Sequence, residues 1–210
     1  MHGINQVAVR HDVGLTFGSS IRSILRQDPN IIMIGEIRDF ETVDVAIKAA
    51  LTGHLVLTTL HTTTATGCIV RLINMGVEPF LISSSVLLVA SQRLVRKICP
   101  QCKEQYVLSH DMAKNLNLEG NIAVYKGKGC KNCNNTGYRG RSGLIETLIL
   151  TPQIRDLILE KVQENVLVDA ARKQGMQSLR QNAVAKLING MTSVEEVLRV
   201  TVGEQDIPTS

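Results

Sequence analysis

The 210-residue sequence contains no tryptophan, and only 3% of its residues are aromatic. Stacking platforms for single-stranded nucleic acid are built from such side chains, and no recognition helix is evident, so we predict no nucleic-acid partner. No apolar run approaches the roughly 18 residues of a membrane span, and the N-terminus lacks the apolar core of a signal peptide. The five cysteines are therefore interpreted as reduced thiols or metal ligands of an intracellular globular protein.

Positive charge is concentrated in the middle of the chain. The net charge is +4, and residues 91–142 contain ten basic residues against three acidic ones. Residues 1–90 contain six against seven, and residues 143–210 seven against nine. An acidic protein surface, an anionic membrane or nucleic acid can each exploit such a segment, and a solvated basic face is the alternative interpretation.

Two apolar segments separated by a helical pattern form the strongest signal in the chain. Ile31–Ile34 and Leu55–Leu60 are short apolar runs, and we predict both as buried strands. Between them apolar residues recur at helical spacing, with Asp39 at the expected N-cap and Gly53 where the helix would end. Two strands joined by one helix predict a right-handed crossover between parallel strands.

A carboxylate and an imidazole follow these two predicted strands. Glu36 comes shortly after the first strand and His61 directly after the second. Because the carboxyl ends of parallel strands meet at one edge of a sheet, both side chains are expected to share a crevice. Taken alone, Glu36 is better explained as a solvated acid and His61 as a hydrogen-bonded loop residue. Together, and beside Arg38 and several threonines, they favour a site for a polyanion.

The sequence here resembles a known family. ILRQDPNIIMIGEIRD resembles the Walker B region of the secretion ATPases, and GHLVLTTLHT is similar to their histidine box. The family is that of the type II secretion ATPase and the type IV pilus assembly ATPase, and the similarity runs from Gly3 to Thr201. It implies an α/β fold: the C-terminal half of a RecA-like P-loop NTPase core, with a tetracysteine zinc element and a C-terminal helical subdomain.

The resemblance also implies how the chain is divided. We expect the ATPase core over residues 1–96, the tetracysteine element over 97–142, and a helical subdomain over 143–202. A strand at Arg141–Leu150 is expected to return to the main sheet. Residues 203–210 are expected to be a disordered tail.

The function implied by the resemblance is that of an ATP-hydrolysing motor, with ATP and Mg²⁺ as cofactors. It would power pilus or pseudopilus assembly and protein export, as a homo-hexamer on inner-membrane platform proteins at the cytoplasmic side. Glu36 would orient or deprotonate the attacking water, and His61 would contact the γ-phosphate. Since nucleotide lies at subunit junctions in this family, four arginines are candidates to reach it from the same or a neighbouring subunit: Arg22, Arg26, Arg38 and Arg71.

A phosphate-binding loop of the form G-x-x-x-x-G-K-[ST] does not occur in the sequence. The family carries it, together with an acidic Asp box, upstream of the Walker B region, so the sequence is interpreted as truncated. The loop supplies an amide cradle, a lysine and a magnesium-binding hydroxyl. Because no other element here replaces all three, we expect the chain alone to bind ATP weakly or not at all and to be inactive.

Two C-x-x-C pairs carry the second strong signal. Cys99 and Cys102 are separated from Cys130 and Cys133 by 27 residues. Each tight turn can aim two sulfurs at one ion, and four thiolates in tetrahedral geometry suit Zn²⁺. A thioredoxin-like redox site would need only one pair. With four sulfur ligands no position stays open, so we expect this zinc to be structural. The fifth cysteine, Cys68, is interpreted as a small buried residue.

An alternative function belongs to a different class. The chain would be a zinc-stapled interaction module without ATPase activity of its own, whose basic segment docks on an acidic or inner-membrane platform partner. The lysines that would carry this contact are Lys126, Lys128 and Lys131.

Overall fold

The computed structural model describes residues 3–201. Packing contacts divide the chain into two compact units, one formed by the chain up to Val89 with Leu148–Gln174, the other by Ala90–Thr147 with the residues from Gly175 on. These units divide the chain at other positions than the predicted segments 1–96, 97–142 and 143–202, which stay a prediction. The predicted disordered tail, 203–210, lies outside the described residues. Among the described helices, none has the length and apolar character to cross a bilayer.

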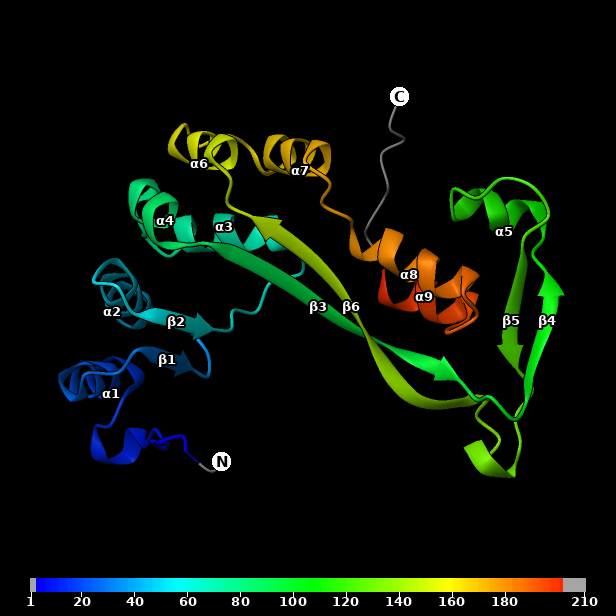
Figure 1. Cartoon of the computed structure of the whole chain (residues 1–210), viewed down its shortest axis with the longest axis horizontal. Coiled ribbons are helices and arrows are strands. Elements are labelled where there is room, and N and C mark those ends of the chain that lie inside the picture. Colours follow the sequence, from blue (N-terminus) through cyan, green and yellow to red (C-terminus); the bar gives the residue numbers. More distant parts are fainter. Residues whose placement is uncertain (1–2, 202–210) are drawn as a thin grey trace. The chain divides into compact units, whose positions relative to one another are not determined.

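The first unit is built on two parallel strands. β1 (Ile31–Ile34) pairs with β2 (Leu55–Thr58), with Ile31 opposite Leu55 and Ile34 opposite Thr58. Helix α2 (Phe40–Leu51) connects them, which confirms the predicted strand–helix–strand unit (Figure 1). The other elements of this unit are a 3-10 turn at His11–Val13, α1 (Phe17–Ile24), a 3-10 turn at Leu25–Gln27, α3 (Ala65–Asn74), α4 (Pro79–Ser85), α6 (Pro152–Leu159) and α7 (Glu164–Lys173).

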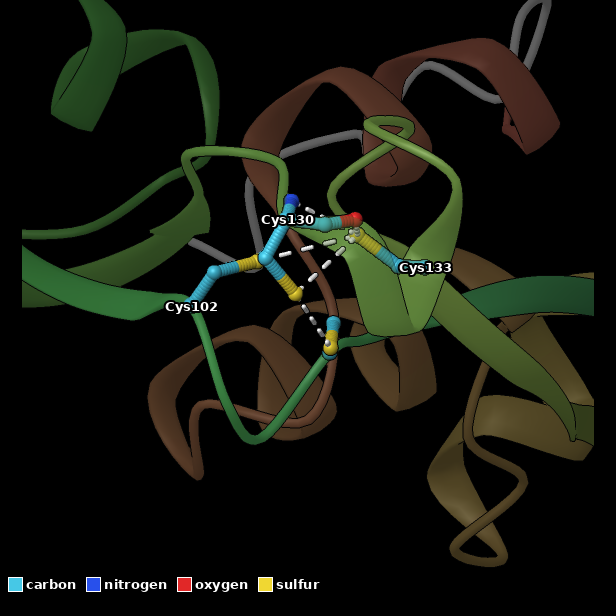
Figure 2. Close-up of side chains that lie close together, drawn as sticks. Cys102, Cys130 and Cys133 are labelled. Carbon is cyan, nitrogen blue, oxygen red and sulfur yellow. Dashed lines mark hydrogen bonds between the residues drawn. The ribbon is translucent and has the colours of Figure 1, made fainter.

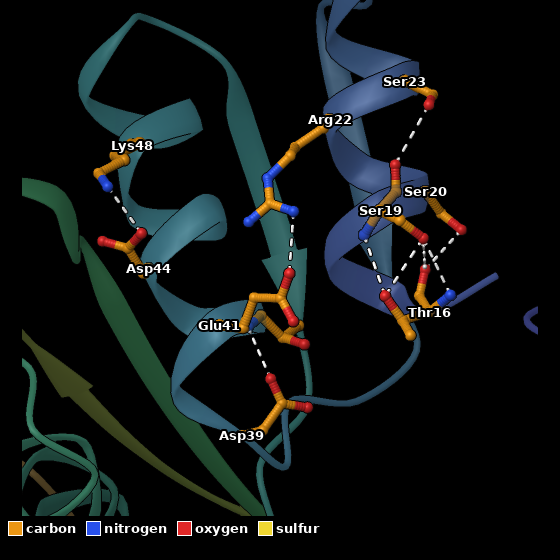
Figure 3. Close-up of polar contacts among 10 residues, drawn as sticks. Thr16, Ser19, Ser20, Arg22, Ser23, Asp39, Glu41, Asp44 and Lys48 are labelled. Carbon is orange, nitrogen blue, oxygen red and sulfur yellow. Dashed lines mark hydrogen bonds and ion pairs between the residues drawn. The ribbon is translucent and has the colours of Figure 1, made fainter. Parts of the chain in front are cut away.

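Side-chain caps fix where the helices on either side of β1 begin. The hydroxyl of Thr16 accepts from the backbone N–H of Ser19 at 3.1 Å, and the Ser19 hydroxyl oxygen accepts from the N–H of Thr16 at 2.9 Å. This capping box starts α1. At α2, Asp39 Oδ1 accepts from the N–H of Thr42 at 2.8 Å, as predicted (Figure 3). Gly53, at a φ of +99°, follows the end of α2. The chain between the strands is therefore fixed by local hydrogen bonds.

The strands are less buried than the sequence indicated. Ile32 and Ile34 are 4% and 2% exposed. Four other apolar side chains of these two strands are between 45% and 77% exposed: Ile31, Met33, Leu55 and Leu57. Side chains of a strand alternate between two faces, and in β1 the face that carries Ile32 and Ile34 is buried whereas the face that carries Ile31 and Met33 is exposed. A continuous apolar run is typical of a strand that is covered on both faces. The prediction of full burial was wrong because one face of these strands is exposed in the described residues.

The second unit combines a hairpin-like strand pair with C-terminal helices. β4 (Lys103–Val107) and β5 (Ala123–Gly127) are antiparallel, with Lys103 opposite Gly127. Helix α5 (His110–Asn115) lies between them in sequence, and α8 (Leu179–Ile188) and α9 (Val194–Val200) follow later. Apolar side chains of these elements form one core together with Val95 and Leu144, which come from the two long strands described next. The other fully buried members of this core include Val124, Leu179, Leu187 and Val197.

Two long strands, β3 (Leu88–Ile98) and β6 (Tyr138–Ile149), pair with each other and run in opposite directions (Figure 1). The predicted return of Arg141–Leu150 to the main sheet is therefore wrong. The N–H of Cys99 donates to the carbonyl of Gly137 at 2.9 Å, just beyond one end of this pair. Because the cysteine turns bring these residues together, the strands that flank them leave side by side and become each other's partners.

Candidate functional site

Hydrogen bonds between the two strand-end loops bring Glu36 and His61 together. The N–H of Ile37 donates to the carbonyl of Thr59 at 3.0 Å, and the Thr59 hydroxyl donates to the carbonyl of Gly35 at 2.6 Å. The loops after β1 and β2 thus continue the parallel pairing beyond the sheet. His61 Nε2 lies 3.1 Å from Glu36 Oε2. The predicted convergence of the acid and the imidazole at one edge of the sheet is confirmed.

Arg38 completes this group. Its Nη2 lies 2.8 Å from Glu36 Oε1, so each oxygen of the carboxylate has its own partner. The hydrogen bonds from Arg38 and His61 lower the pKa of Glu36 below its ordinary value. The side chain of Glu36 is 25% exposed, whereas those of Arg38 and His61 are 72% and 80% exposed. The arrangement is an ionised, well-held carboxylate flanked by two groups that remain open to a ligand.

The remaining candidate arginines lie apart from this carboxylate. Arg22 on α1 forms an ion pair with Glu41 in the first turn of α2, at 2.9 Å between Nη1 and Oε1 (Figure 3). Arg26 and Arg71 are exposed, and within residues 3–201 neither forms an ion pair. Of the four arginines, only Arg38 is paired with Glu36.

The sequence analysis missed Glu164, which contacts the segment that follows His61. Glu164, the first residue of α7, accepts hydrogen bonds from the hydroxyls of Thr64 and Thr66, each at 3.0 Å. These partners are about a hundred residues away in sequence, so no local pattern signals the contact.

The four cysteines of the two C-x-x-C pairs converge in the second unit. Their sulfurs all lie within 4.8 Å of one another. The separations between Cys99 and Cys130 and between Cys102 and Cys133 are both 3.9 Å, and that between Cys130 and Cys133 is 3.7 Å. A tetrahedron with Zn–S bonds of about 2.3 Å has edges of about 3.8 Å. The sulfurs therefore fit a tetrahedral zinc ion, and Figure 2 shows the side chains of Cys102, Cys130 and Cys133 close together.

Backbone N–H groups around the second pair favour thiolates. Burial by itself raises the pKa of Cys133, but hydrogen bonds from the N–H groups of Cys130 and Gly137 lower it to about 6. Burial opposes ionisation of Cys99 as well, yet hydrogen bonds that include one from Asn132 lower its pKa. Desolvation raises the pKa of Cys102 to about 12. A bound dication is the ordinary means of compensating such a cluster, since a coordinating thiol is deprotonated.

Glycines let the chain turn tightly around the second pair. Gly129 has a φ of +94°, and a Cβ placed there would lie 2.8 Å from the carbonyl oxygen of Asn135. Both features require glycine. Cys68 stands apart from this cluster: it is 6% exposed, and desolvation raises its pKa to about 11. It is the small buried residue predicted.

Several basic residues of the second unit already have partners. Lys128 forms an ion pair with Glu104, and Lys126 lies over the ring of Tyr106 at 5.4 Å. Lys103 lies over the ring of Tyr125 at 4.0 Å. The basic segment is thus partly neutralised or stacked rather than uniformly open.

The chain matches the family model described as "Type II/IV secretion system protein" over residues 1–199. It is 44% identical to the type IV pilus assembly ATPase PilB of Myxococcus xanthus, over 97% of this chain and 37% of that protein. It is 46% identical to the type II secretion system protein E of Pseudomonas aeruginosa, over 96% of this chain and 40% of that protein. The chain therefore spans about two fifths of the length of these relatives.

Solved structures give the same result for the fold. The Legionella pneumophila ATPase DotB superposes with a TM-score of 0.64 at 25% identity, over 97% of this chain and 48% of that one. The pilus retraction motor PilT, solved with bound ADP, superposes with a TM-score of 0.61 at 28% identity, over 89% of this chain and 44% of that one. The predicted secretion-NTPase fold is confirmed.

Proposed function

Because the chain belongs to the type II/IV secretion system protein family, we propose that it carries the Walker B and histidine-box part of an ATP-hydrolysing motor for type II secretion or type IV pilus assembly. The observation that supports this most directly is the 3.1 Å contact between Glu36 and His61 at the ends of two parallel strands. Open α/β sheets bind their ligands at such strand ends. Glu36, His61 and Arg38 together offer what a triphosphate with Mg²⁺ requires: one anion and two cationic or hydrogen-bonding groups.

The lowered pKa of Glu36 refines its role. A carboxylate held by Arg38 and His61 is a weak base, and general-base efficiency falls as the pKa of the base drops below the working pH. Glu36 is therefore better suited to orienting the attacking water than to deprotonating it fully. Bound Mg²⁺ would neutralise charge on the phosphates. His61, at the open side of the carboxylate, is the group that meets the γ-phosphate.

The partners of the motor are part of the same proposal. Arg26 and Arg71 are exposed, and a guanidinium group is permanently charged and matches phosphate oxygens. They are the candidates for reaching nucleotide held by a neighbouring subunit of a homo-hexamer. The motor would work at the cytoplasmic side of the inner membrane, against platform proteins of the secretion or pilus machine. The four cysteines would hold one structural Zn²⁺.

The interaction-module alternative receives less support. Of its three lysines, Lys128 is paired with Glu104 and Lys126 is stacked on Tyr106. Only Lys131, which is exposed, offers its charge without such a partner among the described residues. A docking surface that depends on these lysines would first have to release two of them.

The test uses a chimera in which this chain replaces the matching region of the Pseudomonas aeruginosa type II secretion system protein E. We expect the chimera to hydrolyse ATP. Glu36→Gln should bind a fluorescent ATP analogue as well as the unchanged chimera but lose most turnover, on the order of a hundredfold or more, because an amide cannot replace the anion. The matched control is Glu78→Gln, a change of another acid of the same unit. Retained turnover in Glu36→Gln would remove Glu36 from this role.

A further inference from the structure

A carboxylate from a distant helix holds the loop that follows the histidine box. Glu164 Oε1 accepts from the Thr64 hydroxyl and from the Thr66 hydroxyl, both at 3.0 Å. Thr64 is the N-cap of α3, and its oxygen also accepts from the backbone N–H of Gly67 at 3.0 Å. One carboxylate oxygen therefore joins the first residue of α7 to the first turn of α3.

The contact is enclosed by the surrounding atoms. Thr66 is 1% exposed, so its hydroxyl depends on Glu164 for an acceptor. A Cβ on Gly67 would lie 2.7 Å from the Thr64 hydroxyl oxygen and 3.3 Å from Glu164 Oε1. The absence of a side chain at Gly67 is what leaves room for the carboxylate. Helices α3 and α7 also pack against each other.

The position of His61 depends on the two ends of its loop. At one end, Thr59 is bonded to Gly35. At the other, the Thr62 hydroxyl donates to the carbonyl of Thr64 at 3.1 Å. The imidazole itself is 80% exposed, and within residues 3–201 its one hydrogen-bonding partner is Glu36. Few contacts of its own hold the ring, so movement of Thr64 would move it relative to Glu36.

We propose that Glu164 is a positioning residue for His61: through Thr64 and Thr66 its carboxylate fixes the histidine loop and makes α7 and that loop move as one piece. The proposal rests on the proposed function only for the catalytic consequence. The mechanical part concerns the described chain alone and can be tested without nucleotide. The binding of a phosphate by His61 would thereby be transmitted to helix α7.

Amide hydrogen exchange on the 210-residue chain tests the mechanical part. Glu164→Ala should accelerate exchange at residues 62–67, and at Gly67 most, by on the order of tenfold, because a hydrogen bond to a charged group is lost. Glu164→Gln keeps an acceptor oxygen and should stay within about threefold of the unchanged chain. Thr66→Val removes one donor without touching the N-cap and should give an intermediate acceleration. Glu160→Ala, a change of an exposed acid after α6, is the control.

Kinetics in the chimera test the catalytic consequence. Glu164→Ala should lower kcat by on the order of tenfold and change KM by less than that, because His61 supplies only one of the nucleotide contacts. Glu164→Gln should recover most of the loss. In a His61→Ala background, Glu164→Ala should have no further effect on kcat, since the residue that it positions is gone. A merely structural role would lower kcat equally in both backgrounds.

The outcomes separate the two proposals. Unchanged exchange in Glu164→Ala, or full additivity with His61→Ala, overturns the positioning role. If His61→Ala leaves kcat unchanged, the role proposed for His61 is wrong and the kinetic consequence fails with it. The exchange experiment would in that case still decide whether Glu164 holds the loop.

Discussion

Two ion pairs of the second unit, those of Arg96 and Arg199, converge on Glu196. It is fully buried and accepts from the N–H and the guanidinium of Arg96, at 2.8 Å and 2.9 Å, and from two guanidinium nitrogens of Arg199, at 2.7 Å and 2.8 Å. Burial alone would raise the pKa of Glu196, but these hydrogen bonds lower it from 4.5 to about 2. The residue joins β3 to α9 across about a hundred positions of sequence.

The pH dependence of stability follows from this shift. A carboxyl group whose pKa is lower in the folded than in the unfolded protein stabilises the fold when it is ionised. For Glu196 this contribution is complete above the unfolded pKa of 4.5 and is lost as the pH falls through about 2. Glu196→Gln should lower the free energy of unfolding at pH 7 by roughly 3 kcal/mol, and the difference from the unchanged chain should shrink between pH 4.5 and pH 2. Urea titrations at several pH values measure it, with exposed Glu195→Gln as control. If the difference in unfolding free energy does not shrink at low pH, the lowered pKa of Glu196 is wrong.

At the scale of elements, short-range chemistry made the two motif regions predictable. The helix between β1 and β2 begins at the predicted Asp39 and is followed by the predicted Gly53, because caps act within one turn. The spacing of the cysteines likewise predicted that their four sulfurs meet. By contrast, the largely apolar stretch over residues 80–89 is divided between two elements, because α4 ends at Ser85 and β3 begins at Leu88. Short apolar runs do not by themselves distinguish strand from helix.

Metal removal tests the tetracysteine element. We expect about one zinc per chain, because four sulfurs fill a tetrahedral site, and chelation should accelerate amide exchange in the turns at Cys99–Cys102 and Cys130–Cys133. Cys133→Ser should bind no zinc under reducing conditions. Cys68→Ala, a change of the one cysteine outside the cluster, should keep the full amount in a colorimetric zinc assay. Equal zinc binding by Cys133→Ser and the unchanged chain would exclude this ligand set.

At the scale of the whole molecule, the meeting of Glu36 and His61 is not accompanied by a phosphate-binding loop of the P-loop form. The sequence lacks G-x-x-x-x-G-K-[ST], and the amide nest, lysine and hydroxyl of that loop supply most phosphate contacts in P-loop proteins. Titration of the 210-residue chain with a fluorescent ATP analogue should therefore show no saturation in the micromolar range. The chimera with the longer relative is the positive control. Micromolar affinity for the chain alone would mean that other residues hold the phosphates.

The sequence alone determined the strand–helix–strand unit, the meeting of Glu36 with His61, and the cysteine cluster, because each depends on caps, spacing or strand direction within a short stretch. Only the tertiary structure decided that β6 pairs with β3, that one face of β1 and β2 is exposed, and that Glu164 reaches Thr64 and Thr66. These contacts join residues far apart in sequence. Their partners are selected by packing of the whole chain, and no local pattern of side chains encodes that selection.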